Sequence, residues 1–162
     1  MTMICFDVEG MRFNYRVAGI VLHDHQVLLN RFKGRDYWFL PGGRVEMGET
    51  SKEGLLREMQ EELQEEVHVG RLLWIVESFF GGVEERSYHE LGLYYLMNFA
   101  PESPVYQAKE PLLSLDGHAR MTFQWFPLTE LEKITLYPPF LVQGLRNVPE
   151  QTVHLLDAPP RD

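Results

Sequence analysis

Several carboxylates follow a glycine-rich turn at helical spacing, and these are the residues whose types could do chemistry. The turn contains Gly42 and Gly43, and acidic residues follow at Glu49 and in segment 57–62, which reads Arg-Glu-Met-Gln-Glu-Glu. Carboxylate oxygens are ligands that Mg²⁺ and Mn²⁺ prefer, and Mg²⁺ is commonly held by a few carboxylates together with substrate phosphates. The pattern therefore indicates a divalent-cation site that acts on a phosphate.

Four acidic residues in this region are separated by three or four positions: Glu58, Glu61, Glu62 and Glu65. On a helix, which has about 3.6 residues per turn, side chains at this spacing share one face. Three apolar residues are expected to form a second face that packs on the core: Leu56, Met59 and Leu63. Like charges on one helix face repel by about 0.2–0.5 kcal/mol per pair, so a neutralising cation explains the pattern better than helix stability does. A solvated charged face is the alternative, because Glu is a strong helix former.

The whole stretch resembles the Nudix box, which is written G-x5-E-x7-R-E-U-x-E-E-x-G-U with U a bulky apolar residue. The matching positions are Gly43, Glu49, Arg57, Glu58, Met59, Glu61 and Glu62. Apart from the apolar position, such a set matches by chance with a probability on the order of 10⁻⁷ per start site, at an average usage of about 7% per residue type. A weaker similarity covers most of residues 12–146, through segments 38–43, 89–95 and 124–128.

The match to the box fails at its last two positions. Gln64 stands where the family has glycine, and Glu65 stands where it has an apolar residue. The family's glycine ends the helix, whereas glutamine is a good helix former. We therefore expect the helix, which begins with Thr50 or Ser51 as its cap, to run beyond Gln64 towards Gly70.

The resemblance implies a set of metal ligands. Glu58, Glu61 and Glu62 would bind Mg²⁺, or alternatively Mn²⁺. The backbone carbonyl of Gly42 or Gly43 would be a further ligand, and this turn would lie near the substrate phosphates because glycine lets the main chain approach closely. Bound cations would also reverse the local charge and so reconcile an acidic protein with a polyphosphate substrate.

Other charged residues are expected to support this site. Arg57 is expected to pair with Glu49 and brace the turn against the helix, as groups behind metal ligands commonly do. The alternative is an ordinary pair between Arg57 and Glu61, one helical turn apart. Upstream, Arg31 ends a predicted strand, where family members often carry an arginine that binds phosphate. An exposed arginine at the end of a strand is the alternative.

The chemistry implied by the resemblance is hydrolysis of a phosphoanhydride bond. Metal ions lower the pKa of a bound water, and a carboxylate removes its proton as general base. Glu61 is the first candidate for this base. Some relatives use an acid on a late loop, but here Thr122 stands near that position. Three other acids are further candidates for the general base: Glu90, Glu110 and Asp116.

Composition limits the classes of protein to consider. The chain has 162 residues, 44% of them hydrophobic, which suits a single domain over residues 1–162 with a sizeable core. The net charge of −9 argues against binding to a nucleic-acid backbone, which needs basic surface. No segment approaches the roughly 20 apolar residues of a membrane span, and Cys5 is the only cysteine, which fits a reducing compartment. We expect a cytoplasmic protein.

Apolar alternation and turn residues predict more strands than helices. Strands are expected over 13–23, 27–32, 37–40, 71–80, 87–99, 121–126 and 152–156, with a polar turn at 23–26, another at 81–82, and short helices over 129–134 and 139–146. This order favours an α/β fold with a mixed sheet and helices on its faces. The resemblance implies an α/β/α sandwich around a mixed, mostly antiparallel sheet.

The leading functional hypothesis is a metal-dependent hydrolase of a nucleoside diphosphate linked to another group. Candidate substrates are a nucleoside triphosphate, a nucleotide sugar and a dinucleoside polyphosphate, and no residue pattern selects among them. Several aromatic residues could stack on a base, although strand aromatics more often belong to the core: Trp38, Phe79, Phe80 and Tyr88. The alternatives are a Nudix-fold module that senses a nucleotide without cleaving it and an acidic interaction domain. Many family members are dimers, so the resemblance allows for a homodimer.

Overall fold

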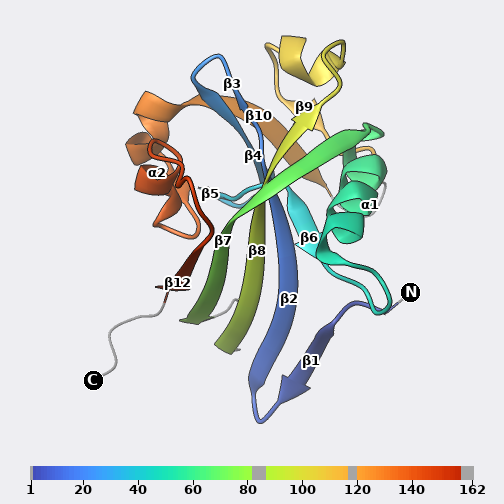
Figure 1. Cartoon of the computed structure of the whole chain (residues 1–162), viewed down its shortest axis with the longest axis vertical. Helices are drawn as coiled ribbons and strands as arrows, with labels where there is room; N and C mark the ends of the chain where they lie inside the picture. Colours follow the sequence, from blue (N-terminus) through green and yellow to red (C-terminus); the bar gives the residue numbers. More distant parts are fainter. Residues whose placement is uncertain (1, 82–86, 117–119, 158–162) are drawn as a thin grey trace.

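A large mixed sheet forms the centre of the structure and appears as the long curved strands in Figure 1. The computed structural model describes residues 2–81, 87–116 and 120–157. Within these ranges the sheet has the order β1-β2-β8-β7-β12, and β6 pairs with β2 beside this path. Its strands are β1 (Cys5–Val8), β2 (Met11–Ile20), β6 (Gly42–Arg44), β7 (Val67–Gly81), β8 (Ser87–Phe99) and β12 (Val153–Asp157). β7 is antiparallel to β8 but parallel to β12, so the predicted mixed sheet is confirmed.

Two smaller sheets extend this arrangement. The first has the order β3-β4-β10-β9, and the second pairs β11 with β5. The strands are β3 (Leu22–His23), β4 (Gln26–Phe32), β5 (Tyr37–Trp38), β9 (Leu112–Leu113), β10 (Met121–Pro127) and β11 (Thr135–Leu136). The predicted polar turn is the hairpin between β3 and β4, where Asp24 and His25 have φ angles of 47° and 60°. Positive φ at both central residues matches the twist of a two-residue hairpin.

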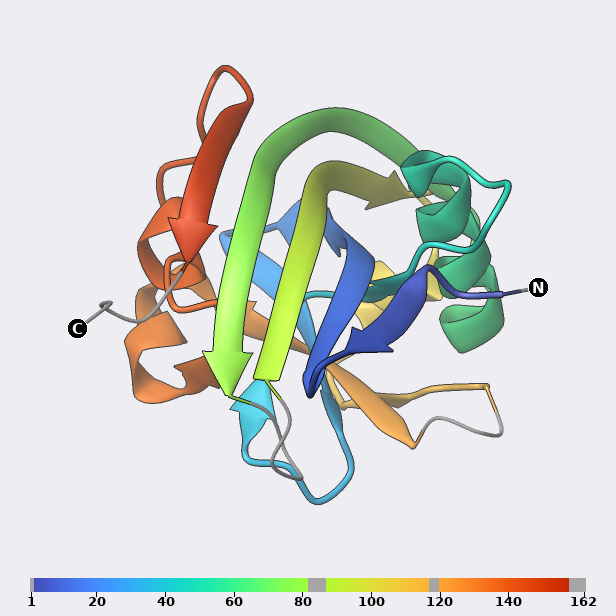
Figure 2. The same ribbon diagram turned by 90° about the horizontal axis from the view of Figure 1, so that it is seen from below.

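Helical segments cover both faces of the large sheet, as Figures 1 and 2 show from two directions. They are α1 (Ser51–Leu63), η2 (Pro104–Gln107), η3 (Leu128–Lys133) and α2 (Leu141–Gly144). Side chains of α1 belong to one hydrophobic cluster, and those of η3 and α2 belong to a second. Neighbouring residues of β2 supply both clusters, since Val17 packs in the first and Ala18 in the second. The expected α/β/α layering is confirmed. The helix predicted over 129–134 is the six-residue 3-10 helix η3, one residue earlier, whereas α2 is shorter than the helix predicted over 139–146.

The start of α1 agrees with the sequence. Thr50 is the N-cap, and its hydroxyl accepts a hydrogen bond from the backbone N–H of Glu53 at 3.3 Å. The Glu53 carboxylate in turn accepts from the backbone N–H of Thr50 at 2.7 Å. This reciprocal pair is a capping box, which satisfies two backbone donors at the N-terminus of a helix. It fixes where the helix begins relative to the glycine turn.

The end of α1 corrects the sequence prediction. The helix stops at Leu63, and Gln64 adopts left-handed angles of φ 55° and ψ 33°, the conformation that glycine favours at this position. Strand β7 then begins at Val67, earlier than predicted. Glutamine therefore takes the role of the missing glycine at some conformational cost, because the tertiary structure needs the chain to turn back into the sheet.

The buried face of α1 also differs from the prediction. Leu56 is 41% exposed and does not belong to the core, whereas Leu55 is fully buried with Met59. Glu58 and Glu62 lie on this same inward face and are buried. The helix therefore does not separate an apolar face from an acidic one; it carries two of its carboxylates into the protein.

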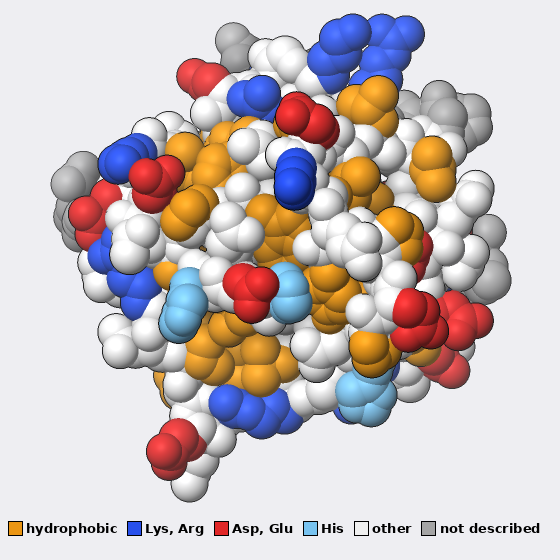
Figure 3. All heavy atoms as spheres, turned by 90° about the horizontal axis from the view of Figure 1, so that it is seen from above, with side chains coloured by type: hydrophobic (Ala, Val, Ile, Leu, Met, Phe, Trp, Pro, Cys, Tyr) orange, Lys and Arg blue, Asp and Glu red, His pale blue; other side chains and the backbone are white. Residues whose placement is uncertain are grey.

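On the face in Figure 3, Lys and Arg side chains lie in small groups near the edges, and hydrophobic, acidic and His side chains lie between them. Among the described residues, no helix is both long and apolar enough to cross a membrane. Of the two glycines in the predicted turn, Gly81 is the last residue of β7, and Gly82 lies outside the described residues.

Replacing Gln64 by glycine should stabilise the protein by about 1 kcal/mol, because glycine takes left-handed angles without the steric cost that a Cβ imposes. Chemical denaturation of the Gln64→Gly variant checks this through the free energy of unfolding. The control is Gln60→Gly in the exposed middle of α1, which should lose about 1 kcal/mol of stability. Equal losses in both variants would contradict the conformational argument.

Candidate active site

The glycine turn lies directly against α1. Gly43 packs so closely on Glu58 that a Cβ at this position would overlap the carboxylate. Gly42 has a φ of 139°, and a Cβ there would overlap the carbonyl oxygen of Val17 in β2. Both glycines are therefore required by close approach, and the main chain of the turn forms one wall of the site next to the carboxylate.

Arg57 ties the loop, β6 and α1 together. Its Nη2 donates to Glu49 Oε1 at 2.8 Å and its Nε to Glu49 Oε2 at 3.2 Å, which makes a two-pronged ion pair. Nη2 also donates to the backbone carbonyl of Arg44 at 3.0 Å. Nη1 donates to Glu58 Oε1 at 2.9 Å and to Glu61 Oε2 at 3.3 Å. The Glu49 pair predicted from the sequence is present, and the alternative pair with Glu61 is present too.

Glu49 closes the loop at the other end of this ion pair. Its Oε1 also accepts a hydrogen bond from the backbone N–H of Glu46 at 2.7 Å. The hydrogen bond from Arg57 is the main reason why the pKa of Glu49 is lowered, and the Glu46 N–H acts in the same direction. Glu49 thus stays ionised and holds the loop in place, which is the bracing function that its spacing from Arg57 predicted.

Glu62 is the most unusual carboxylate of the site. Its side chain is buried, with the residue only 4% exposed, and Oε2 has no hydrogen-bond partner. Burial raises its pKa to about 8, and the negative charge of Glu58 adds to the rise. Burial likewise raises the pKa of Glu58, against the opposing effect of Arg57. A buried carboxylate without a partner is costly, so this pair calls for a neutralising cation.

These residues fit a divalent metal ion such as Mg²⁺. The donors are hard oxygen atoms, Oε2 of Glu62 has no hydrogen-bond partner, and the lack of a Cβ at Gly43 lets the Glu58 carboxylate lie against the main chain of the turn. Glu61 is 52% exposed at its side chain and lies on the rim. Within the described residues, no three His, Cys, Asp or Glu side chains already surround one point, and Arg57 donates hydrogen bonds to both Glu58 and Glu61.

The three alternative candidates for the general base lie in different places. Asp116 is close enough to Glu62 for its charge to raise the pKa of that carboxyl, although burial and the charge of Glu58 contribute more. The backbone N–H of Leu115 next to it donates to the carbonyl of Glu62 at 2.8 Å. Glu90 lies in a pocket beyond β2, and Glu110 is exposed in the segment before β9. Only Asp116 thus joins the carboxylates of α1.

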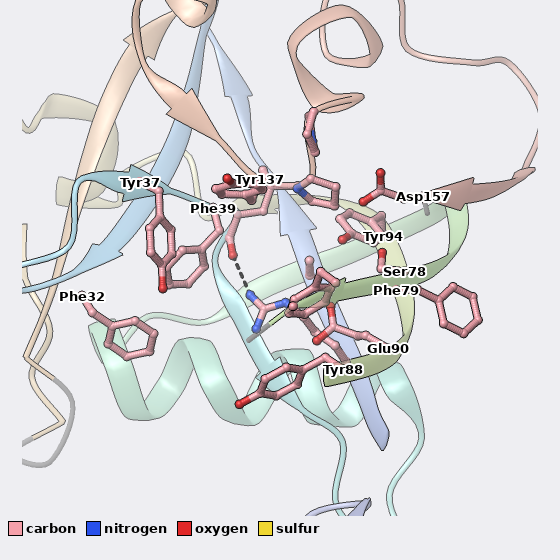
Figure 4. A pocket seen from close by; sticks show the side chains of 17 residues that line it. Phe32, Tyr37, Phe39, Ser78, Phe79, Tyr88, Glu90, Tyr94, Tyr137 and Asp157 are labelled. Carbon is pink, nitrogen blue, oxygen red and sulfur yellow. Dashed lines mark hydrogen bonds between the residues drawn. The ribbon is translucent and has the colours of Figure 1, made fainter. Parts of the chain in front are cut away.

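A pocket of about 640 Å³ opens on the other side of β2 from α1 (Figure 4). Its lining is mainly aromatic: Phe32, Tyr37 and Phe39 from one wall, Phe80, Tyr88 and Tyr94 from the sheet, and Tyr137 from the segment before α2. Phe80 and Tyr88 stack with their centroids 5.1 Å apart and their planes within 4°. Two of the predicted stacking residues therefore line a pocket, and flat aromatic walls suit a planar ligand.

The other two aromatic candidates lie differently: Trp38 is not among the pocket residues, and Phe79 is among them but turns its ring away. Trp38 is buried, packing against Phe126 with the guanidinium of Arg31 4.5 Å from its ring centroid. Figure 4 shows the Phe79 side chain pointing away from the cavity, where it stacks on His89 across the opposite face of the sheet. Arg31 is thus placed on Trp38 and is not among the pocket residues.

Arg16 is a candidate that sequence reasoning missed. It lines the pocket from β2, and its Nη2 donates to the carbonyl of Leu40 at 3.1 Å (dashed in Figure 4). Its charge also opposes the rise that burial causes in the pKa of Glu58 and Glu62. Arg16 therefore lies between the aromatic pocket and the acidic helix. A signal exists in the sequence, since strand alternation places this charged residue on the same face as Ala18.

Replacing Arg57 by lysine should destabilise the protein by about 2 kcal/mol, because one ammonium group cannot donate to Glu49, Glu58 and the Arg44 carbonyl together. The free energy of unfolding, measured by chemical denaturation, checks this. The control is Arg71→Lys, since Arg71 makes an exposed hydrogen bond to the carbonyl of Glu150 at 3.1 Å. Equal losses in both variants would show that the network contributes nothing beyond a surface contact.

Without divalent cations, the protein should become less stable as the pH rises from about 5 to about 8. The pKa of Glu62 is raised to about 8 in the fold, whereas an unfolded Glu titrates near about 4.3. Between these values the folded state holds a proton that the unfolded state lacks, so raising the pH favours unfolding. Glu58, with its raised pKa, acts in the same direction.

Thermal unfolding in a chelator, measured over this pH range, tests the expectation. Glu62→Gln carries no titrating proton and should flatten the dependence, while added Mg²⁺ should restore stability most at the high-pH end. A pH dependence that is equally steep in the variant would mean that Glu62 does not titrate in this range.

Comparison with known proteins adds three findings. A model of the NUDIX domain matches residues 13–147. The Bacillus subtilis (strain 168) protein named "Putative ADP-ribose pyrophosphatase YjhB" is 34% identical over 73 residues, which are 45% of this chain and 35% of that protein. The matched region thus spans about a third of the length of this curated relative.

Solved structures share the fold at low identity. The MutT protein from Methanosarcina mazei Go1 superposes with a TM-score of 0.60 at 18% identity, over 86% of this chain and 94% of that one. The MutT NUDIX hydrolase from Burkholderia pseudomallei gives 0.56 at 23% identity, over 80% and 95%. Because the domain model matches most of the sequence and these structures share its sheet and helices, the chain belongs to the Nudix family.

Proposed function

We propose that the chain is a metal-dependent hydrolase that cleaves a phosphoanhydride bond in a nucleoside diphosphate linked to another group. The single observation that carries this proposal is the buried Glu62 carboxylate with its unpartnered Oε2, next to Glu58 and the glycine turn. A binding module with no use for a cation gains nothing from this costly arrangement. Family membership supports the same reaction class.

The residues of the site divide the work. Glu58, Glu62 and Glu61 would hold Mg²⁺, or Mn²⁺ in its place, and the backbone of Gly42 or Gly43 would complete the ligand set. When bound, the cation neutralises the phosphates and lowers the pKa of an attacking water. A network in which Arg57 holds Glu58 from behind keeps the carboxylate oriented, as groups behind metal ligands commonly do.

Glu61 remains the proposed general base. Its side chain is the exposed one of the three, so a water can reach it, and one oxygen is engaged by Arg57 at 3.3 Å. Accepting the proton of the attacking water needs a carboxylate within hydrogen-bond distance of that water. Asp116 is the rival for this role, because its charge acts on Glu62.

Substrate binding is proposed to use the pocket beyond β2. Arg16 lies where the diphosphate would bridge from the pocket to the carboxylates, and a guanidinium suits phosphate oxygens. The sequence candidate Arg31 is proposed only for an outer phosphate, because it lies on Trp38. Nucleoside triphosphates, nucleotide sugars and dinucleoside polyphosphates form the substrate class, and the name of the curated relative adds ADP-ribose to the compounds to test.

Glu62→Gln should lower Mg²⁺-dependent turnover by orders of magnitude, because glutamine keeps the shape but removes the negative charge that holds the cation. Release of phosphate or pyrophosphate from a panel of these compounds measures turnover. The matched control is Glu65→Gln, which removes a half-buried acid just beyond the end of the same helix and should leave turnover near its original value.

The same panel separates the proposal from its alternative. Unchanged turnover in Glu62→Gln would overturn the metal assignment. Binding of nucleotides without release of phosphate from any compound would favour the non-catalytic sensing module. A single domain over residues 1–162, a cytoplasmic location and a homodimer remain predictions.

A further inference from the structure

The floor of the aromatic pocket contains a row of polar side chains that the phosphate chemistry does not use. Asn14, Glu90, Ser78 and Asp157 are cross-strand partners in β2, β8, β7 and β12, so they follow one another across the sheet at the same level. Glu90, Ser78 and Asp157 line the pocket, and Figure 4 shows them on the side opposite Tyr37 and Phe39.

This polar row lies beside flat aromatic surface. The stacked pair of Phe80 and Tyr88 comes from the next level of the same strands, since these two residues are cross-strand partners. Phe39 and Tyr37 form the opposite wall, with centroids 6.3 Å apart. Aromatic walls and a polar row thus line the same pocket, which suits a planar ring with polar groups on its edge better than a flexible or non-planar group.

The polar row is dominated by hydrogen-bond acceptors. Ionised carboxylates only accept hydrogen bonds, so Glu90 and Asp157 call for donors from whatever occupies the pocket. They would also repel a phosphate, which directs the phosphates towards Arg16 and the cation site. The pocket thus has an acceptor-lined inner part and a basic residue on the side of α1.

Neighbouring side chains keep the two carboxylates in position. Asn14 is buried, and its Nδ2 donates to Glu90 Oε2 at 3.4 Å while its Oδ1 accepts from Arg44 Nε at 3.1 Å. Burial raises the pKa of Asp157, and a hydrogen bond from the Ser78 side chain opposes that rise. Each carboxylate therefore has one protein donor and keeps further acceptor capacity for a ligand.

We propose that Glu90 and Asp157 select a nucleobase that carries an exocyclic amino group, such as adenine or guanine. This inference rests on the proposed function, in which the nucleobase belongs to the nucleoside that carries the diphosphate. An amino group supplies the N–H donors that the carboxylates need, whereas a carbonyl at the same place would put two acceptors against each other. Both carboxylates are half-buried, and a ligand that leaves such acceptors unpaired binds more weakly than one that pairs them.

Calorimetric titration of nucleoside monophosphates tests this inference. These compounds contain no phosphoanhydride bond, so binding is measured without hydrolysis. AMP and GMP should bind at least about tenfold more tightly than IMP, which differs from GMP by one amino group. In Glu90→Gln or in Asp157→Asn this ratio should fall towards one, because an amide offers one acceptor where the carboxylate offered two.

The control is Glu77→Gln in β7, the strand between β8 and β12, where Glu77 is on the opposite face to Ser78 and its Oε1 lies 2.7 Å from His154 Nε2. This variant should keep the original ratio. Equal binding of all three nucleotides, no binding of any, or an unchanged ratio in both pocket variants would overturn the inference. A pocket that binds UDP-glucose more tightly than AMP or GMP, in a manner dependent on Glu90, would assign the row to a sugar instead.

These outcomes are separate from those of the turnover panel. A protein that hydrolyses the panel but does not distinguish IMP from GMP keeps the proposed function and loses this inference. A protein that shows the binding ratio but releases no phosphate from any compound keeps the inference and loses the proposed reaction.

Discussion

The hydrogen bonds of one guanidinium hold the acidic site in its shape. Arg57 contacts the loop through Glu49, the short strand β6 through the carbonyl of Arg44, and α1 through Glu58. Because Arg is planar and always charged, it can satisfy several acceptors in fixed directions at once. The close packing of Gly43 on Glu58 depends on this arrangement, since both require the loop to lie tightly against the helix. The position of the glycine turn therefore follows from an ion pair.

The second constraint is electrostatic and follows from the first. Holding the loop against α1 buries Glu58 and Glu62, and burial raises the pKa of both carboxyls. Arg57 partly compensates Glu58, while Glu62 keeps an oxygen without a partner. Arg16 on the other side of β2 opposes the rise for both. The packing thus leaves the site short of positive charge. In the proposed function a bound cation would supply that charge and so reconcile a net charge of −9 with a polyphosphate substrate.

Residues close together in the sequence were predictable, and residues brought together by tertiary structure were not. The box spacing located the Glu49–Arg57 pair, and the capping residues located the start of α1, because both depend on contacts within about one helical turn or one loop. The prediction that α1 runs beyond Gln64 was wrong, since tertiary structure overrode the helix propensity of glutamine. The prediction also placed Leu56 on the buried face of α1, where the structure has Leu55. Arg16 and the pocket depend on pairing between distant strands, which a single sequence does not reveal.

The last strand, β12, completes the pocket but not the acidic segment of the site. Residues 42–62, which supply the turn, Arg57 and the acids, are contiguous in the sequence, although the buried side of α1 also packs against later residues such as Tyr95 and Phe123. The pocket floor is complete only after residues 153–157 have paired with β7, about 80 positions earlier in the chain. The proposed cation site therefore rests on one contiguous segment, whereas the inner end of the pocket depends on the last strand, so substitutions in β12 would alter the pocket without changing the acidic segment.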